Sequence, residues 1–412
     1  MERRALLSLL GTVGGLAGCL RFQGASEPTS QPTTTSRATT DRTTLSTTGQ
    51  PTPTGTSPAV TETTKSFPIT LEQQWTDRGL VSAIWEREGA FFVNEFFRLA
   101  RFTSGGDLTW ESRRITEDTD RHFDTDLVVT DAVVGVGTST TVDESDAGGE
   151  LRGYSRDDGT VQWSVAAPAD GNHHLMAHVE STADGTVIGV SQGHGQSDEQ
   201  DPVIYAVDGA TGERQWTSSE LPRGFVHDIA VRNRQLLVGT SVEGLLIFDV
   251  DSGTQVATHD AVEVTFAGMA VDGSVVYTSD DPIQAFDLDG ETRRWETVIV
   301  STVKGGPSVG DGQVYYGTES GQLVAIDAAS GEQQWTATTQ AMIRMDPVVQ
   351  GGVVWVADHA GTTYAFDAET GELAYRLDPW DDIERSRPIG AIDETVLVGG
   401  VPTKAFSVAD SV

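Results

Sequence analysis

The segment Leu323–Trp335, LVAIDAASGEQQW, decides the fold, because copies of it recur along the chain. The four residues before Asp327 alternate with a period of two, as in a half-buried β-strand. Asp327 can accept hydrogen bonds from the backbone N–H groups that follow it, and Gly331 can take the positive φ of a tight turn. We therefore expect a hairpin whose second strand carries the large ring of Trp335.

Copies of this segment lie at Phe102–Trp110, Tyr154–Trp163, Tyr205–Trp216, Phe248–Ala257, Ala285–Trp295 and Ala365–Tyr375. The turn acids at 208, 249, 287, 327 and 367 follow one another at intervals of 41, 38, 40 and 40 residues. A period near 40 is typical of one four-stranded sheet per repeat, with the flat ring filling the wedge between neighbouring sheets. The predicted docking residues are Asp208, Gly212, Trp216, Asp327, Gly331, Trp335, Trp75, Trp110, Trp163 and Trp295.

The two ends of the repeat region complete each other. Glu72–Thr76 reads EQQWT, identical to Glu332–Thr336, but no turn segment precedes it. Lys404–Val408 reads KAFSV, which is the strand and turn of a repeat without its tryptophan strand. We expect both to belong to one blade, so that the N-terminal strand closes the ring. The positions equivalent to Trp335, which are 75, 110, 163, 216, 257, 295, 335 and 375, predict eight antiparallel four-stranded blades, with seven as the alternative.

Small residues stand two positions before the turn acid in most repeats, as Ala206 and Ala325 do. The exception is Ile247, in the repeat that has Ala257 where a tryptophan is expected. We interpret this as an exchange of volume within a packed core.

The repeated pattern Ala-x-Asp-x-x-x-Gly-x-x-x-Trp, over Leu71–Val412, resembles the tryptophan-docking motif of pyrroloquinoline-quinone-like propeller repeats. That superfamily includes quinoprotein alcohol dehydrogenases and the non-catalytic propeller lipoprotein of the bacterial outer-membrane assembly machinery. The resemblance implies an all-β propeller, but a fold does not by itself carry a function.

The first 19 residues resemble an export signal. Arg3 and Arg4 precede a short apolar segment, as in twin-arginine signals. The sequence before Cys19, Leu-Ala-Gly, resembles a lipobox, in which the cysteine takes a lipid. Cys19 is the only cysteine of the chain, so we expect no disulfide bond.

Residues 20–66 are rich in Thr, Ser and Pro and almost free of apolar side chains, which predicts an extended stalk that can carry sugars. Residues 67–412 form the propeller domain. The chain has 61 acidic and 27 basic residues, a formal charge of −34, and only three lysines. This balance disfavours nucleic-acid binding and is typical of secreted proteins of extreme halophiles.

Catalytic motifs are not recognisable in the sequence. Quinoprotein dehydrogenases of this fold typically carry adjacent cysteines, calcium-binding carboxylates and a catalytic aspartate, and this chain has no cysteine pair. Pyrroloquinoline quinone and calcium therefore stay an alternative and not the prediction. His173, His174, His178 and His194 suggest a metal site only if the chain folds back on itself, so we assign no metal ligands.

The start of each repeat is expected to line the central channel. Aligning these strands by their prolines brings several charged side chains to about one level. The predicted polar funnel for a small ligand or a peptide comprises Asp126, Asp228, Asp346, Arg344, Arg387, Lys304 and His227. The alternative is that these groups are strand ends that pair with one another.

We thus expect a monomeric binding or scaffolding module for protein partners, attached to the membrane by lipid on Cys19 and exposed on the extracellular face. Catalytic residues are not assigned. A quinone-dependent dehydrogenase and an extracellular solute or metal binder remain the alternatives.

Overall fold

The computed structural model describes residues 69–77, 83–94, 98–113, 121–140, 149–168, 174–193, 202–380, 387–392, 395–399 and 403–410. The regular elements of these ranges are all β-strands. Within them, no helix is long and apolar enough to cross a membrane.

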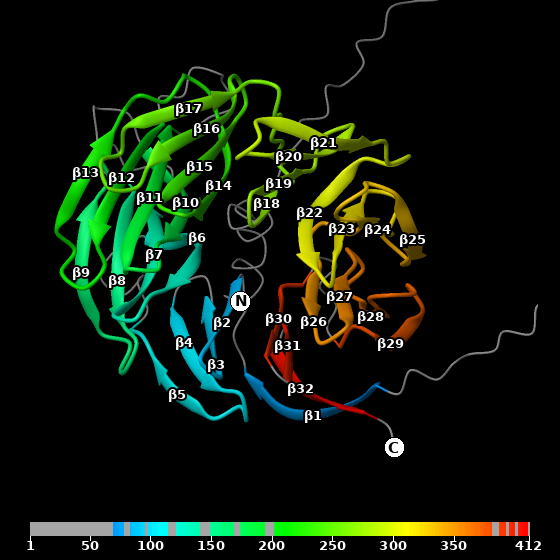
Figure 1. The fold of residues 1–412 in the computed structure, drawn as a ribbon. Helices are drawn as coiled ribbons and strands as arrows, with labels where there is room; N and C mark the ends of the chain where they lie inside the picture. Colours follow the sequence, from blue (N-terminus) through cyan, green and yellow to red (C-terminus); the bar gives the residue numbers. More distant parts are fainter. Residues whose placement is uncertain are drawn as a thin grey trace, which may run out of the picture. The chain divides into compact units, whose positions relative to one another are not determined.

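The strands form eight four-stranded antiparallel sheets, or blades, which follow one another in chain order (Figure 1). Blade 1 holds β2 (Ala83–Arg87), β3 (Ala90–Asn94), β4 (Leu99–Thr103) and β5 (Leu108–Glu111). Blade 2 holds β6 (Arg121–Val129), β7 (Val133–Thr140), β8 (Glu150–Ser155) and β9 (Val161–Ala166). Blade 3 holds β10 (His174–Ser181), β11 (Thr186–Gly193), β12 (Val203–Asp208) and β13 (Arg214–Ser218). Blade 4 holds β14 (Val226–Arg232), β15 (Gln235–Thr240), β16 (Gly244–Asp249) and β17 (Gln255–His259).

The second half of the chain repeats the same meander. Blade 5 holds β18 (Met269–Asp272), β19 (Val275–Thr278), β20 (Ile283–Asp287) and β21 (Thr292–Thr297). Blade 6 holds β22 (Val303–Gly310), β23 (Gln313–Thr318), β24 (Gln322–Asp327) and β25 (Gln333–Thr338). Blade 7 holds β26 (Val348–Gln350), β27 (Val353–Ala357), β28 (Thr363–Asp367) and β29 (Leu373–Leu377).

Blade 8 joins the two ends of the repeat region. It holds β30 (Ile389–Ile392), β31 (Thr395–Val398), β32 (Thr403–Asp410) and β1 (Ile69–Asp77). Strand β1 runs antiparallel to β32, with Ile69 opposite Asp410 and Trp75 opposite Ala405. The innermost strand β2 contacts both β6 and β30, so the ring is closed. Eight blades and closure by the N-terminal strand are therefore confirmed, and the seven-bladed alternative is wrong.

The hydrophobic core lies in layers between blades. One layer contains Tyr315 and Leu323 of blade 6 with Val354 and Val356 of blade 7, all buried. Each blade thus covers an apolar face of the next, and burying one such side chain contributes about 1.5–3 kcal/mol.

Because every blade is a meander, the connections fall on two faces. One face carries the turns that join the first strand to the second and the third strand to the fourth, and we call it the turn face. The loop face carries the turns between second and third strands and the segments that lead from one blade to the next. The predicted docking motif lies on the turn face, while the predicted funnel residues with described side chains lie near the loop-face ends of innermost strands.

Candidate functional site

The acid of each strong repeat organises its own turn. Asp327 Oδ1 accepts hydrogen bonds from Ala329 N at 3.1 Å, Ser330 N at 2.7 Å and Ser330 Oγ at 2.8 Å. The Ser330 hydroxyl and backbone N–H lower the pKa of Asp327. Gly331 closes the turn at φ 76°. Asp208 makes the same contacts with Ala210 and Thr211, so the turn is a recurring local unit of the repeat.

Each docking tryptophan whose side chain is described reaches across to the turn of the next blade. Trp295 of blade 5 donates its indole N–H to Ala328 O at 3.0 Å, and its ring covers Gly331 of blade 6. A Cβ on Gly331 would lie 2.6 Å from that ring. The same contact links four further pairs of blades, through Trp110 to Gly159, Trp163 to Gly212, Trp216 to Gly253 and Trp335 to Gly371. The glycine is therefore required both by its φ and by the ring that covers it.

A small residue stands opposite most of the docking rings on the neighbouring strand, and the exception is Arg101 opposite Trp110. Ala206 pairs with Trp216, Ala325 pairs with Trp335, and Gly153 pairs with Trp163. A Cβ on Gly153 would lie 2.2 Å from the Trp163 ring. The register of Trp75 opposite Ala405 follows the same rule, while the side chain of Trp75 lies outside the described residues.

The joint between blades 4 and 5 lacks this contact. Ala257 replaces the tryptophan, and Ile247 stands directly opposite it. In blade 5 the glycine position, four residues after Asp287, is occupied by Glu291 at φ 49°. Since the Cβ of a residue at this place would collide with a docked ring, both halves of the contact are missing together. Ile247, Phe286 and Leu288 fill the joint instead.

The predicted funnel carboxylates bind backbone groups of a neighbouring blade. Asp228 of blade 4 accepts a hydrogen bond from Met269 N of blade 5 at 2.8 Å. Asp346, just before blade 7, accepts one from Gly306 N of blade 6 at 2.7 Å. Both contacts join consecutive blades, so these carboxylates stabilise the ring.

The predicted basic residues lie in different surroundings. Arg387 is 1% exposed, and it donates to Gly361 O at 2.9 Å and to Gly399 O at 3.1 Å while lying over the Trp380 ring. It therefore ties blade 7 to blade 8. Arg344 contacts the Met342 sulfur, and Lys304 is half-buried in β22.

His227 and Asp126 are the remaining predicted funnel positions. His227 packs edge-on against Phe266, with ring centroids 3.9 Å apart. Asp126 is in β6, but its side chain lies outside the described residues, as do Arg3, Arg4, Cys19, His173 and His194. His178 faces blade 4, with its Nε2 3.1 Å from Val226 O. Across the described ranges, no three His, Cys, Asp or Glu side chains converge as metal ligands.

Two glutamates that sequence reasoning missed also belong to innermost strands. Glu86 of blade 1 accepts a hydrogen bond from Ala391 N of blade 8 at 2.8 Å. Burial raises the pKa of Glu86 to about 7, although this hydrogen bond opposes the shift. Burial likewise raises the pKa of Glu180 to about 7, with a smaller contribution from the charge of Asp228. Nothing in the sequence spacing sets these two glutamates apart from the many other carboxylates of the chain.

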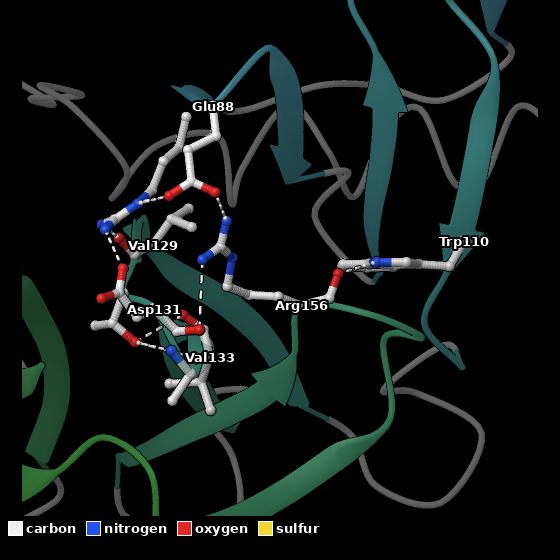
Figure 2. Close-up of polar contacts among 9 residues, drawn as sticks. Glu88, Trp110, Val129, Asp131, Val133 and Arg156 are labelled. Carbon is white, nitrogen blue, oxygen red and sulfur yellow. Dashed lines mark hydrogen bonds and ion pairs between the residues drawn. The ribbon is translucent and has the colours of Figure 1, made fainter.

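Figure 2 shows how the turn face links blades 1 and 2. Arg156 donates to the Glu88 carboxylate at 2.8 Å, and its own carbonyl accepts the Trp110 indole N–H at 2.7 Å. Arg87 contacts the Val129 carbonyl and the Asp131 carboxylate. Arg156 thus combines the docking contact with an ion pair back to blade 1.

An acid-lined hollow of about 210 Å³ lies beside this network, between the turns of blades 2 and 3. Its carboxylates are already engaged. Asp131 contacts Arg87, Asp184 pairs with Arg234 at 3.0 Å, and Asp208 holds its own turn. The hollow is therefore a by-product of the turn structure.

A family comparison identifies the repeats. Residues 200–298 and 279–408 match the family described as outer membrane protein assembly factor BamB, and together they span just over half of the chain. The chain belongs to this family. No curated protein sequence matches the chain significantly.

Solved structures share the BamB-like fold. BamB from Moraxella catarrhalis has a TM-score of 0.61 at 15% identity, covering 82% of this chain and 98% of that one. The computationally designed protein Ika8 has a TM-score of 0.60 at 14% identity, covering 82% and 98%. Quinohemoprotein alcohol dehydrogenase ADHIIG from Pseudomonas putida HK5 has a TM-score of 0.60 at 13% identity, covering 83% and 77%. These values establish the propeller fold and not an activity.

The residues of this chain do not match the set expected for a quinone-dependent dehydrogenase. Cys19 is the only cysteine, so the adjacent pair is lacking. The carboxylates Asp228 and Asp346, which could have held calcium, accept backbone N–H groups of neighbouring blades.

Proposed function

We propose that this member of the BamB family is a non-catalytic binding or scaffolding module for protein partners. In this proposal the chain is a monomer, and a lipid on Cys19 holds it at the extracellular face of the cell membrane. The stalk of residues 20–66 separates the propeller from the membrane. The family match and the likeness to BamB from Moraxella catarrhalis support the scaffolding role.

The observation that carries the proposal is that carboxylates of the inner strands and their flanking segments bind the backbone of the neighbouring blade. Asp228, Asp346 and Glu86 each accept a backbone N–H of an adjacent blade. Groups used in this way hold the blades in a fixed arrangement, so the ring can present its loops as a rigid surface. A rigid platform loses little conformational entropy on binding, which favours a role in recognition.

The proposal is tested by titrating the purified full chain in high salt with pyrroloquinoline quinone and calcium while following its melting temperature. A ligand that binds the folded state at 100 times its Kd stabilises it by about 2.7 kcal/mol. We expect no shift. A saturable shift that the double variant D228N/D346N abolishes would overturn the scaffold role in favour of cofactor binding.

Anchoring is tested separately in the native host. Cys19→Ser should release the exported protein into the medium, and Arg3→Lys with Arg4→Lys should retain it inside the cell. If the serine variant stays bound to the membrane, lipid on Cys19 is not the anchor.

A further inference from the structure

The loop face of blades 4 to 6 exposes apolar side chains. Val242, in the turn between β15 and β16, is 57% exposed. Val298 and Val300, in the segment that leads from blade 5 to blade 6, are 68% and 99% exposed. Exposing these side chains to water is unfavourable, so an apolar set on consecutive blades marks a candidate contact surface.

Buried neighbours hold these segments in place. Ile299 is buried between the two exposed valines, so the segment cannot turn them inward together. In the segment from blade 4 to blade 5, Val262 and Val264 are buried and leave Glu263 between them exposed. Both segments therefore present their outward side chains in a fixed arrangement.

Aromatic rings pack between the start of blade 4 and the segment that leads from blade 4 to blade 5. Phe266 lies 3.9 Å from His227 and 6.2 Å from Phe225, measured between ring centroids. Val242 continues this cluster, because a Cβ on the adjacent Gly224 would lie 2.7 Å from Val242 Cγ2. Val242 and the three rings therefore lie close together on the loop face, and Val298 and Val300 lie on the same face in the next connecting segment.

The same segments are strongly acidic. Across residues 219–227, 240–244, 259–269, 278–283 and 296–304 there are seven carboxylates against two cations: Glu220, Glu243, Asp260, Glu263, Asp280, Asp281 and Glu296 against Arg223 and Lys304. The carboxyl groups of Glu263 and Asp280 are within hydrogen-bonding reach, and this contact raises the pKa of Glu263. Two carboxyl groups this close repel each other when ionised, and a bound cation relieves that repulsion.

We propose that this surface, the apolar-acidic face of blades 4 to 6, binds a protein segment in which lysine or arginine side chains flank apolar or aromatic ones. The inference rests on the proposed scaffolding function and specifies its contact surface. The apolar side chains supply the buried area, and the carboxylates select a basic partner. An anionic lipid surface or a nucleic acid would meet the same carboxylates and be repelled.

The first test uses the purified full chain and a fluorescent nonapeptide with the repeat Lys-Leu-Phe, at the lowest salt concentration that supports cooperative unfolding. The Kd is measured by anisotropy. We expect Val298→Ser with Val300→Ser to raise the Kd at least tenfold, and Glu263→Gln with Asp280→Asn to raise it about threefold or more. The exposed positions of the two valines leave the fold intact, which a melting curve checks.

The matched control changes apolar side chains elsewhere on the surface. Val256 and Leu373, on outermost strands, are 56% and 53% exposed, and their replacement by serine should leave the Kd unchanged. A peptide with glutamate in place of lysine should not bind. The inference is overturned if the peptide does not bind, if the control pair weakens it as much as the valine pair, or if the acidic peptide binds equally well.

A second test separates this inference from the proposed function. A photo-crosslinking amino acid is placed at position 300 or at position 373 of the full chain in living cells. Capture of a partner from position 300, lost in the Glu263→Gln, Asp280→Asn background, supports the inference. Capture from position 373 alone contradicts the inference but remains consistent with the scaffold role. No capture from either position contradicts both.

Discussion

At the scale of single residues, Gly331 shows how one position can meet two demands. Its φ of 76° lies in the left-handed region, which favours glycine over other residues. The Trp295 ring also occupies the place of a side chain there. Gly312 has almost the same φ, 77°, but a Cβ added to it would meet no atom within 4 Å. The two glycines therefore separate backbone strain from loss of the docking contact.

Gly331→Ala is predicted to destabilise the protein more than Gly312→Ala. The control variant carries only the cost of a positive φ, about 1–2 kcal/mol. Displacing the Trp295 ring adds about 1–3 kcal/mol in the Gly331 variant. Denaturant unfolding of both variants measures the difference. Equal losses would mean that the ring moves aside freely and that docking contributes little.

Glu86 is predicted to make the folded state less stable as the pH rises. Its pKa is about 7 in the folded protein, against 4.5 for a glutamate in an unfolded chain, so the folded state binds more protons between these values. The free energy of unfolding therefore falls as the pH rises from about 4.5 to 7. Glu86→Gln keeps an acceptor for Ala391 N, and it should be more stable than the wild type by about 2–3 kcal/mol at pH 8.

Below pH 4.5 the wild type and the Glu86→Gln variant should unfold at the same denaturant concentration, because both side chains are then neutral. Glu88→Gln is the neighbouring control with the opposite sign. The hydrogen bond and charge of Arg156 lower the pKa of Glu88, so its ionised form favours folding. A Glu86→Gln variant less stable than the wild type at pH 8 would show that the buried carboxylate is stabilised there.

At the scale of elements, the blade is a unit that recognises its neighbour through one ring and one turn. The joint between blades 4 and 5 departs from this rule on both sides, with Ala257 in place of the ring and Glu291 in place of the glycine. Ile247 occupies the volume opposite Ala257. These three positions therefore depend on one another and should behave as a coupled set.

Restoring the docking contact at this joint is predicted to require all three changes. Ala257→Trp alone should destabilise the protein by about 1–3 kcal/mol, because the ring meets Ile247 and the Cβ of Glu291. Ile247→Ala alone should cost about 2–5 kcal/mol by leaving a cavity. The triple variant that also carries Glu291→Gly should be more stable than the sum of the three single effects predicts. We expect its free energy of unfolding to exceed that sum by at least about 1.5 kcal/mol, as measured in a mutant cycle. Strict additivity would show that the positions do not interact.

At the scale of the whole molecule, the ring must close although the chain carries a formal charge of −34. Closure depends on β1 pairing with β32, so the first and last described strands form one sheet. Mutual repulsion of the carboxylates opposes any compact state, and dissolved salt screens it, with a Debye length of about 10 Å at 0.1 M and about 3 Å at 1 M.

The melting temperature is therefore predicted to rise when KCl is increased from 0.1 M to 2 M. Calorimetry of the full chain at pH 7 measures the effect. At pH 4 many carboxylates are protonated, so the same increase in salt should raise the melting temperature less. An equal rise at both pH values would trace the effect to apolar burial and not to charge.

The sequence by itself determined the number of blades, the closure by the N-terminal strand and the chemistry of the turn. These features are readable because they are local or periodic. The turn motif is local, because Asp327 and Gly331 are four positions apart and the same spacing recurs in other blades. The ring closure is readable because the incomplete repeats at Glu72–Thr76 and Lys404–Val408 complete each other. Membership of the repeat family followed from the same spacing.

Only the tertiary structure decided what the polar side chains of the innermost strands do. Glu86 and Ala391 are 305 positions apart, and the hydrogen bond between them depends on the stagger of two strands in different blades. The alignment by prolines placed Asp228 and Asp346 near the loop face but could not show which backbone N–H each would meet. The spacing around Glu291 does not show what a side chain at that place excludes, whereas the Trp295 contact with Gly331 does. Spacing along the chain fixes the blade, whereas contacts between blades depend on how two rigid sheets pack.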